Sequence, residues 1–406
     1  MKAAAKRWSY PAKHLKKRSW SDIEVLNASG NFVIRLDLSV RGFTPAGKKK
    51  WQRDVPRDRT SGSSNHHSAE LIQTAGVLIM SYRHPARTIR AETGPLVTNV
   101  IEALDPATGR TLWKTVISLF VTVLDSTVYT ALCRAQQTGR RDECMLSARD
   151  AQTGRVLWTI PTEHMPYIVD GDGTTLAMGT RPEGYGGKYW LTALDKRTGA
   201  RLGLRVDARR FAGGRPVKGD YFSDTYVADG RVVLVTSRIN QQAENCDVTE
   251  AARDVRTGKR VWHAAWQDPG CEYGQRWEGS SLPRVTGDGT LTLRDPATGK
   301  VTWKAEQPGG TILAADGGNV LVSSDEVLTL YGKARTWTLH AGKTRSFLTK
   351  ERVLLTYSDA TLAYDVGTGE PLGEAKGSSA GLGDGWVATT TTDHDNEKTI
   401  ITVYRL

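Results

Sequence analysis

Few residues in this 406-residue chain are spaced for chemistry, and the best match is a serine motif. The segment Gly377–Gly381 (Gly-Ser-Ser-Ala-Gly) fits the pattern that presents a nucleophilic serine, here Ser379. That pattern works only where a strand of an α/β sheet turns sharply into a helix. We expect the segment to lie in a loop between two repeats of a β-rich chain. We therefore assign no catalytic residue.

Two acidic segments, residues 170–174 and 393–397, contain enough oxygen atoms to suggest a calcium site. Neither has the twelve-residue spacing of a calcium-binding loop, and the first coincides with a recurring Asp-Gly turn. The adjacent His66 and His67 would point to opposite faces of a strand, so they would not bind one metal together. We therefore predict no metal site.

The elements that position these residues are organised by an internal repeat, Asp-x-x-Thr-Gly-x-x-x-Trp. Four copies are complete: Asp105–Trp113, Asp150–Trp158, Asp254–Trp262 and Asp295–Trp303. Two copies keep the turn but have glycine at the Trp position: Asp195–Gly203 and Asp365–Gly373. Two copies are weaker: Gly47–Trp51 keeps the glycine and the Trp but has Phe43 at the Asp position, and Leu328–Trp337 has a shortened turn but keeps the Trp.

Each copy has the composition of a β-hairpin turn followed by a returning strand. The Asp can accept hydrogen bonds from amides two or three residues on, and the Gly can adopt the left-handed conformation that closes the turn. A large flat side chain that recurs on the returning strand suits the wedge-shaped gap between neighbouring sheets. We predict this docking role for six residues: Trp51, Trp113, Trp158, Trp262, Trp303 and Trp337.

Eight units, about 34 to 62 residues apart, predict an all-β, eight-bladed β-propeller. Seven blades would result if the unit ending at Trp337 is not a blade. Each blade would be a four-stranded antiparallel sheet, and helix should be scarce. Residues 386–392 and 399–406 have strand character without a following motif. We expect them to pair with the N-terminal strand near Gly47 and so close the ring.

The net charge of +11 is concentrated at the N-terminus. The first twenty residues contain seven Lys or Arg and no acid, so the rest of the chain carries only +4. We assign residues 1–20 to a basic lead-in segment that could approach an anionic membrane, and residues 21–406 to one propeller domain. Because the basic charge lies mainly in that segment, we do not expect nucleic-acid binding.

The four cysteines fall into two pairs. Cys133 and Cys144 flank a polar loop between two strands, and Cys246 and Cys271 lie at the same end of one hairpin. Each pair can approach to bonding distance, so we predict the disulfides Cys133–Cys144 and Cys246–Cys271. Disulfides persist in oxidising compartments. We therefore expect an extracytoplasmic protein, secreted or membrane-anchored, whose leader lies outside the sequence given.

The repeat resembles that of the quinoprotein-like (PQQ-like) β-propellers, whose blades carry an Ala-x-Asp-x-x-Thr-Gly-x-x-x-Trp docking motif. The resemblance covers roughly residues 40–406. That family includes quinone-dependent alcohol dehydrogenases, outer-membrane assembly lipoproteins and propeller domains of receptor-like serine/threonine kinases. The dehydrogenases have adjacent cysteines in a vicinal disulfide, and this sequence has no Cys-Cys pair. The resemblance therefore implies a non-catalytic scaffold or sensor that binds no cofactor.

We predict that the protein binds a protein, peptide or glycan through the propeller's funnel or one face, as a monomer or within a larger assembly. Two alternatives stay open: a quinone-dependent dehydrogenase-like enzyme, and the extracellular sensor domain of a membrane receptor such as a kinase. Segments after each docking Trp should reach the mouth of the funnel, and an Arg beside an aromatic residue suits a binding hot spot. The candidate binding residues are Arg276, Trp277, Glu278, His66, His67, His164, Asp220 and Tyr221.

Overall fold

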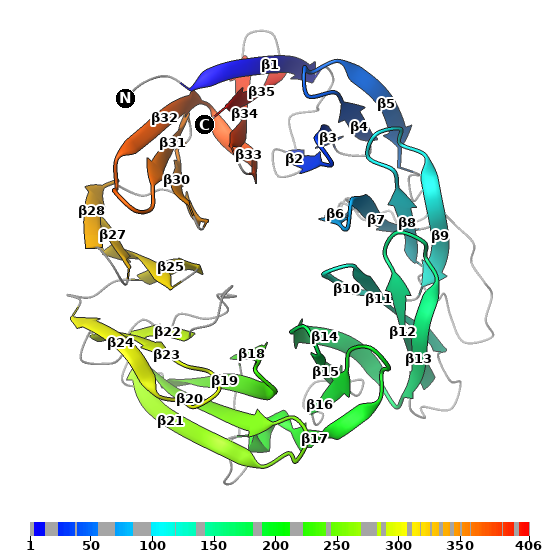
Figure 1. Cartoon of the computed structure of the whole chain (residues 1–406), viewed down its shortest axis with the longest axis vertical. Coiled ribbons are helices and arrows are strands. Elements are labelled where there is room, and N and C mark those ends of the chain that lie inside the picture. The colour runs from blue at the N-terminus through cyan, green and yellow to red at the C-terminus, as the bar shows by residue number, and fades with distance from the viewer. Residues whose placement is uncertain are drawn as a thin grey trace. The chain divides into compact units, whose positions relative to one another are not determined.

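The computed structural model is almost entirely β-sheet (Figure 1). It describes residues 4–12, 23–36, 39–55, 70–83, 99–117, 119–134, 143–181, 189–211, 222–240, 245–268, 282–285, 290–306, 311–316, 318–324, 327–332, 336–341, 345–349, 351–357, 359–383, 385–393 and 398–405. Within these ranges the helical structure is a single 3₁₀ turn, η2 (Ala208–Arg210). The chain divides into two compact units. Unit 1 is Met1–Pro166, Tyr357–Leu362 and Leu372–Leu406, and unit 2 is Tyr167–Thr356 and Ala363–Pro371.

Unit 1 contains four four-stranded sheets. The first three are each built from consecutive strands: β2 (Ile23–Ala28), β3 (Asn31–Leu36), β4 (Ser39–Phe43) and β5 (Lys49–Asp54); β6 (Glu70–Thr74), β7 (Val77–Arg83), β8 (Asn99–Leu104) and β9 (Thr111–Ile117); β10 (Leu119–Leu124), β11 (Thr127–Arg134), β12 (Glu143–Asp150) and β13 (Val156–Thr162). The fourth has the order β1–β35–β34–β33 and joins both ends of the chain: β1 (Ala5–Ala12), β33 (Ser378–Gly383), β34 (Trp386–Asp393) and β35 (Lys398–Arg405).

Unit 2 contains three four-stranded sheets and one with three described strands. Their strands are β14 (Met165–Gly171), β15 (Thr175–Arg181), β16 (Trp190–Asp195) and β17 (Arg201–Asp207); β18 (Phe222–Ala228), β19 (Arg231–Asn240), β20 (Asn245–Asp254) and β21 (Arg260–Asp268); β22 (Leu282–Val285), β23 (Thr290–Arg294) and β24 (Val301–Glu306); β25 (Thr311–Asp316), β26 (Asn319–Ser324), β27 (Val327–Tyr331) and β28 (Thr336–His340). The division between the units runs through the remaining sheet: β29 (Arg345–Leu348), β30 (Arg352–Thr356), β31 (Ala360–Asp365) and β32 (Pro371–Lys376).

The prediction of eight blades, or seven, is wrong, because the described strands form nine sheets. The antiparallel four-stranded blade itself is as predicted. In the eight sheets built from consecutive strands, the repeat motif falls between the last two strands. In the ninth sheet the third strand is β35 and the fourth is β1. No turn connects these two strands, so the sequence contains no repeat motif from which this blade could be predicted.

The N- and C-terminal strands do pair, but through β1 rather than through the strand at Trp51. The register runs from Ala5 opposite Arg405 to Ala12 opposite Thr399. Residues 5–12, placed by the sequence analysis in a basic lead-in segment, therefore form an integral strand of a blade.

The inner strands are apolar on both faces because each sheet that lies between two others packs against a neighbouring sheet on each side. Phe32, Val33 and Ile34 are consecutive on β3, and all three are completely buried. Outer strands alternate instead, and β24 reads exposed, half-buried, exposed from Thr302 to Lys304. The cores consequently lie between neighbouring sheets rather than inside any one of them.

The Asp of each repeat holds its turn as the sequence suggests. The carboxylate of Asp195 accepts hydrogen bonds from the backbone N–H and the hydroxyl of Thr198, at 2.8 and 2.7 Å. Its backbone carbonyl accepts from the N–H of Gly199 at 2.8 Å, and Gly199 has a φ of 71°. A side chain would be strained at that φ, so glycine is required to close the turn.

The docking Trp residues bind the turn of the next sheet along the chain. The indole N–H of Trp51 donates to the carbonyl of Pro106 at 3.0 Å, and its ring lies against Gly109. Trp113 and Ala151, Trp262 and Pro296, and Trp337 and Val366 repeat this hydrogen bond. Each acceptor is the residue directly after the turn Asp. Trp158 is buried, whereas Trp113, Trp262 and Trp303 are half-buried.

One sheet of unit 2 replaces the docking Trp by backbone contact. There Gly203 stands at the Trp position on β17 and lies directly against the next turn. A Cβ on Gly203 would lie 1.7 Å from the carbonyl oxygen of Arg256, and the N–H of Leu204 donates to the carbonyl of Val255 at 3.0 Å. Val255 follows the turn Asp, so the acceptor position is the same one that the indoles use elsewhere.

We therefore expect Gly203→Ala to destabilise the protein by about 1–3 kcal/mol, because the added methyl overlaps a backbone oxygen. Gly173→Ala is the matched control, since a Cβ there meets nothing within 4 Å. Thermal or urea unfolding of both variants measures the difference. Equal midpoints for the two would contradict the proposed backbone docking.

The turn carboxylates also predict a pH dependence. The pKa values of Asp150 and Asp195 are lowered mainly by the hydroxyl of the turn threonine, and that of Asp254 mainly by the backbone N–H of Thr257. A lowered pKa adds stability above the unfolded-state value of about 3.9, which is lost as the pH falls through the folded-state value. Thermal unfolding at pH 6 and pH 3 should therefore show a smaller loss on acidification in D150N/D195N/D254N than in the parent. An equal loss on acidification in the variant and the parent would contradict this role of the turn carboxylates.

Candidate functional site

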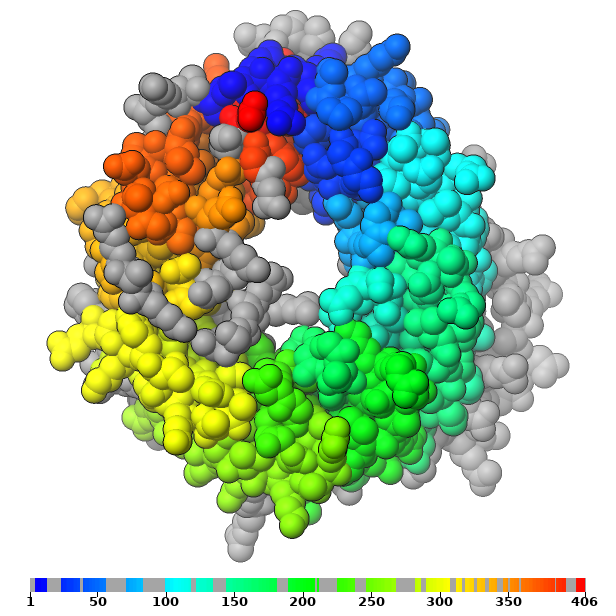
Figure 2. All heavy atoms as spheres, in the orientation of Figure 1, coloured from blue at the N-terminus to red at the C-terminus, as the bar shows by residue number. Residues whose placement is uncertain are grey.

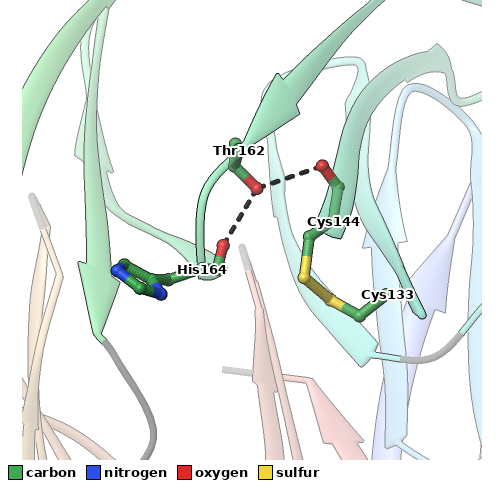
Figure 3. Close-up of a disulfide and its surroundings, with 4 residues drawn as sticks. All are labelled: Cys133, Cys144, Thr162 and His164. Atoms are coloured by element: carbon green, nitrogen blue, oxygen red, sulfur yellow. Dashed lines mark hydrogen bonds between the residues drawn. A yellow bond between two sulfur atoms is a disulfide. The ribbon is translucent and has the colours of Figure 1, made fainter. Parts of the chain in front are cut away.

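Most of the predicted funnel residues lie outside the described residues: Arg276, Trp277, Glu278, His66, His67, Asp220 and Tyr221. His164 is described, in the connection between β13 and β14, and is half-buried. The hydroxyl of Thr162 lies 2.9 Å from the carbonyl oxygen of His164 and 3.3 Å from that of Cys144 (Figure 3). The imidazole points away from these contacts. His164 therefore marks one edge of the blade formed by β10 to β13.

The predicted disulfide Cys133–Cys144 is confirmed at that same edge. The two residues are direct partners in the pairing of β11 with β12, with Cα atoms 4.0 Å apart. Both side chains are buried, so the sulfur atoms face the interior of the unit. Cys246 is also disulfide-bonded, and Cys271, its predicted partner, lies outside the described residues. The disulfide thus staples the ends of two strands that hydrogen bonds alone would leave free to separate.

A row of apolar side chains occupies the opposite, exposed face of these stapled strand ends. Leu132 pairs with Met145 across β11 and β12, and Met145 pairs with Pro161 across β12 and β13. Leu132 is 49% and Met145 42% exposed, and Pro161 is also exposed. We call these three residues the apolar ladder. Exposed apolar side chains that adjoin one another on a rigid element are typical of a protein-binding surface.

Two buried glutamates that the sequence did not single out are paired with arginines of neighbouring sheets rather than presented to solvent. Glu102 on β8 accepts from Arg53 of the preceding sheet at 2.7 Å, and from Thr111 and Tyr82. Glu250 on β20 is completely buried and paired with Arg284 at 2.8 Å and Arg294 at 3.4 Å. A carboxylate held this way is a poor general base. For Glu102, an acidic residue within an otherwise apolar strand was the available signal.

The remaining groups with shifted pKa also serve the repeat. Burial lowers the pKa of the Arg149 and Arg253 guanidiniums. Each sits directly before a turn Asp and donates to the carbonyl of that turn's glycine, Gly154 at 3.2 Å and Gly258 at 2.8 Å. Burial likewise raises the pKa of Tyr129 to about 12. These groups reinforce turns and cores.

The acidic segment at residues 170–174 behaves as a turn. Asp172 caps the N–H groups of Thr174 and Thr175 at 2.8 and 2.7 Å, and Asp170 accepts from the N–H of Val227 at 2.6 Å. In the described part of the chain no group of three or more acidic, His or Cys side chains is arranged to hold a metal. Residues 394–397 of the second acidic segment lie outside it.

Ser379 lies within β33, paired with Thr389, and not in the loop that we expected. A strand position of this kind lacks the strand-to-helix turn that a nucleophilic serine motif requires. Among the described residues, no helix is long and apolar enough to cross a membrane.

The chain was compared with known proteins. The family described as outer membrane protein assembly factor BamB matches residues 97–202 and 247–382. No curated protein sequence matches. Solved structures with a similar fold include BamB from Moraxella catarrhalis, at 12% identity over 100% of both chains with a TM-score of 0.44. Quinohemoprotein alcohol dehydrogenase from Comamonas testosteroni has 13% identity over 99% of this chain and 76% of its own, with a TM-score of 0.46.

The matched residues make up more than half of the chain and contain all four complete copies of the Asp-x-x-Thr-Gly-x-x-x-Trp repeat. The repeat, its antiparallel four-stranded blades and this match agree with one another. The chain therefore belongs to the BamB family of PQQ-like β-propeller repeat proteins.

Proposed function

We propose that the protein is a non-catalytic scaffold that binds a partner protein through the apolar ladder of Leu132, Met145 and Pro161. The observation that carries this proposal is the exposure of these side chains on strand ends fixed by the Cys133–Cys144 disulfide. Binding to a preformed surface does not require side chains and backbone to become ordered first. The entropy cost of binding is therefore lower. The family description, an assembly factor, supports a protein partner over the peptide or glycan that the sequence also allowed.

We propose an extracytoplasmic location for the protein. The Cys133–Cys144 disulfide supports it, because such bonds persist in secreted and periplasmic proteins and are rare in the cytosol. We further propose that the protein works near a membrane, with its basic N-terminal strand on the membrane side. The chain would then be a secreted or anchored component of a larger assembly.

A photo-crosslinking amino acid placed at Met145 of the full chain should yield a covalent adduct with one protein in the cells that produce it. The same amino acid at Val261, a comparably exposed apolar position on β21, is the matched control and should give no such adduct. Leu132→Ser should abolish the adduct formed from position 145, because it removes the neighbouring half of the ladder. An adduct unaffected by Leu132→Ser, or formed equally from position 261, would contradict the proposed surface.

The enzyme alternative has a direct test. Titration with pyrroloquinoline quinone in the presence of Ca²⁺, followed by dye-linked oxidation of alcohols and aldose sugars, should show no binding and no turnover. This expectation follows from the repeat's own residues, since Asp, Gly and Trp are already engaged in turns and docking contacts. Tight quinone binding with turnover would replace the scaffold by a dehydrogenase.

A further inference from the structure

The surface where β1 lies beside the turn between β4 and β5 is strongly basic. Five exposed cations occupy it: Lys6 and Arg7 on β1, Lys48 in the turn, and Lys49 and Lys50 on β5. Within the described part of the chain, none of the five forms an ion pair or a side-chain hydrogen bond. Their charge is consequently available to a partner. We call these five residues the basic corner.

The two halves of the basic corner are held together by aromatic packing. The ring of Trp8 lies on Gly47, where a Cβ would come within 2.5 Å of the indole, and stacks on Phe43 with ring centroids 5.5 Å apart. Tyr10 packs edge-on against Phe43 at 4.9 Å. Lys6 and Arg7 directly precede Trp8, and Lys48 directly follows Gly47. Figure 2 shows the atoms of β1 and of the β4–β5 region adjoining on the surface of unit 1.

The turn at the basic corner lacks the carboxylate that other turns of the repeat contain. Asp105 and Asp150 occupy the turn entry in the next two sheets, where the residue after the turn glycine is Arg110 or Arg155. In the turn between β4 and β5 the Asp position is occupied by Phe43, and Lys48 follows the turn glycine. Lys48 therefore has no acid in its own turn. On the flanking strands the described carboxylates are Glu374 on β32 and Asp54 at the far end of β5. The positive potential of this corner is therefore much less compensated than that of its neighbours.

We propose that the basic corner binds the surface of an anionic phospholipid membrane. Four of its five cations are lysines, compact charges that suit headgroup phosphates without fixed geometry. Trp8 is buried and cannot stack on nucleobases, which argues against a nucleic acid. No large apolar side chain is exposed on the described residues of β1 and β5, which argues against the apolar centre of a protein interface.

This inference deepens the proposed membrane proximity by naming the surface responsible, and it is independent of the apolar ladder. Each cation close to an anionic membrane strengthens binding by about fivefold, and salt weakens the attraction. The purified full chain should therefore co-sediment with vesicles of phosphatidylcholine mixed with phosphatidylglycerol, but not with phosphatidylcholine alone. Raising the salt concentration should release it.

The variant K48E/K49E/K50E should lower vesicle binding by at least about tenfold, since three attractions become repulsions. The variant R256E/K259E/K300E changes the net charge by the same amount at exposed positions in two turns of unit 2, and should retain binding. Lys6→Glu with Arg7→Glu, on the other strand of the corner, should reproduce the loss. This second variant tests the proposal independently if K48E/K49E/K50E does not fold.

Equal losses in the corner and control variants would overturn the proposal in favour of non-specific charge attraction. Equal sedimentation with neutral and anionic vesicles would overturn it as well. The proposal would also be overturned if the protein did not sediment with anionic vesicles but bound an oligonucleotide or an acidic peptide tightly. That result would identify a different partner. If vesicle binding fails while the adduct from position 145 persists, the membrane surface is refuted and the scaffold function stands.

Discussion

The contact between one sheet's outer strand and the next sheet's turn is the interaction on which the rest of this structure depends. Single four-stranded sheets bury little surface of their own, so each must be fixed to its neighbours. In four turns the glycine makes room for an indole ring, and the carbonyl after the turn Asp accepts the indole N–H. Where the Trp is absent, Leu204 supplies a backbone N–H to the same acceptor. The acceptor is thus the constant part, and the donor varies.

Buried ion pairs add a second tie between sheets, closer to the cores. Arg53 reaches from one outer strand to Glu102 of the next sheet, and Arg284 reaches Glu250 across the corresponding gap in unit 2. Removing Arg53 would leave the buried Glu102 carboxylate without its charged partner, which is costly. These ion pairs therefore help to specify which two sheets lie next to each other. Indole docking uses the same contact from one sheet to the next and does not distinguish between sheets.

The sequence was sufficient wherever a structure is local. Asp, Thr and Gly act within a single turn, and the docking Trp lies a fixed distance after it, so strands, turns and the Cys133–Cys144 pair could be predicted. The number of blades could not, because β1 and β35 share no turn. The apolar ladder also escaped, since only the register of three strands places Leu132, Met145 and Pro161 in one row. Arg53 and Glu102 are 49 residues apart, and no pattern in the sequence links them.

The sheet that joins both ends of the chain has a consequence for biosynthesis. β1 is synthesised before its hydrogen-bonding partner β35, which lies opposite it with Ala5 paired to Arg405. Until β35 has been synthesised, Trp8 and Tyr10 cannot take their places opposite Val403 and Ile401, and β1 is an unpaired strand open to misassociation. β1 must therefore stay clear of wrong partners while the residues between it and β35 are made. A chain that stops before β35 would lack the strand that pairs with β1 and would leave both β1 and β34 with an open edge.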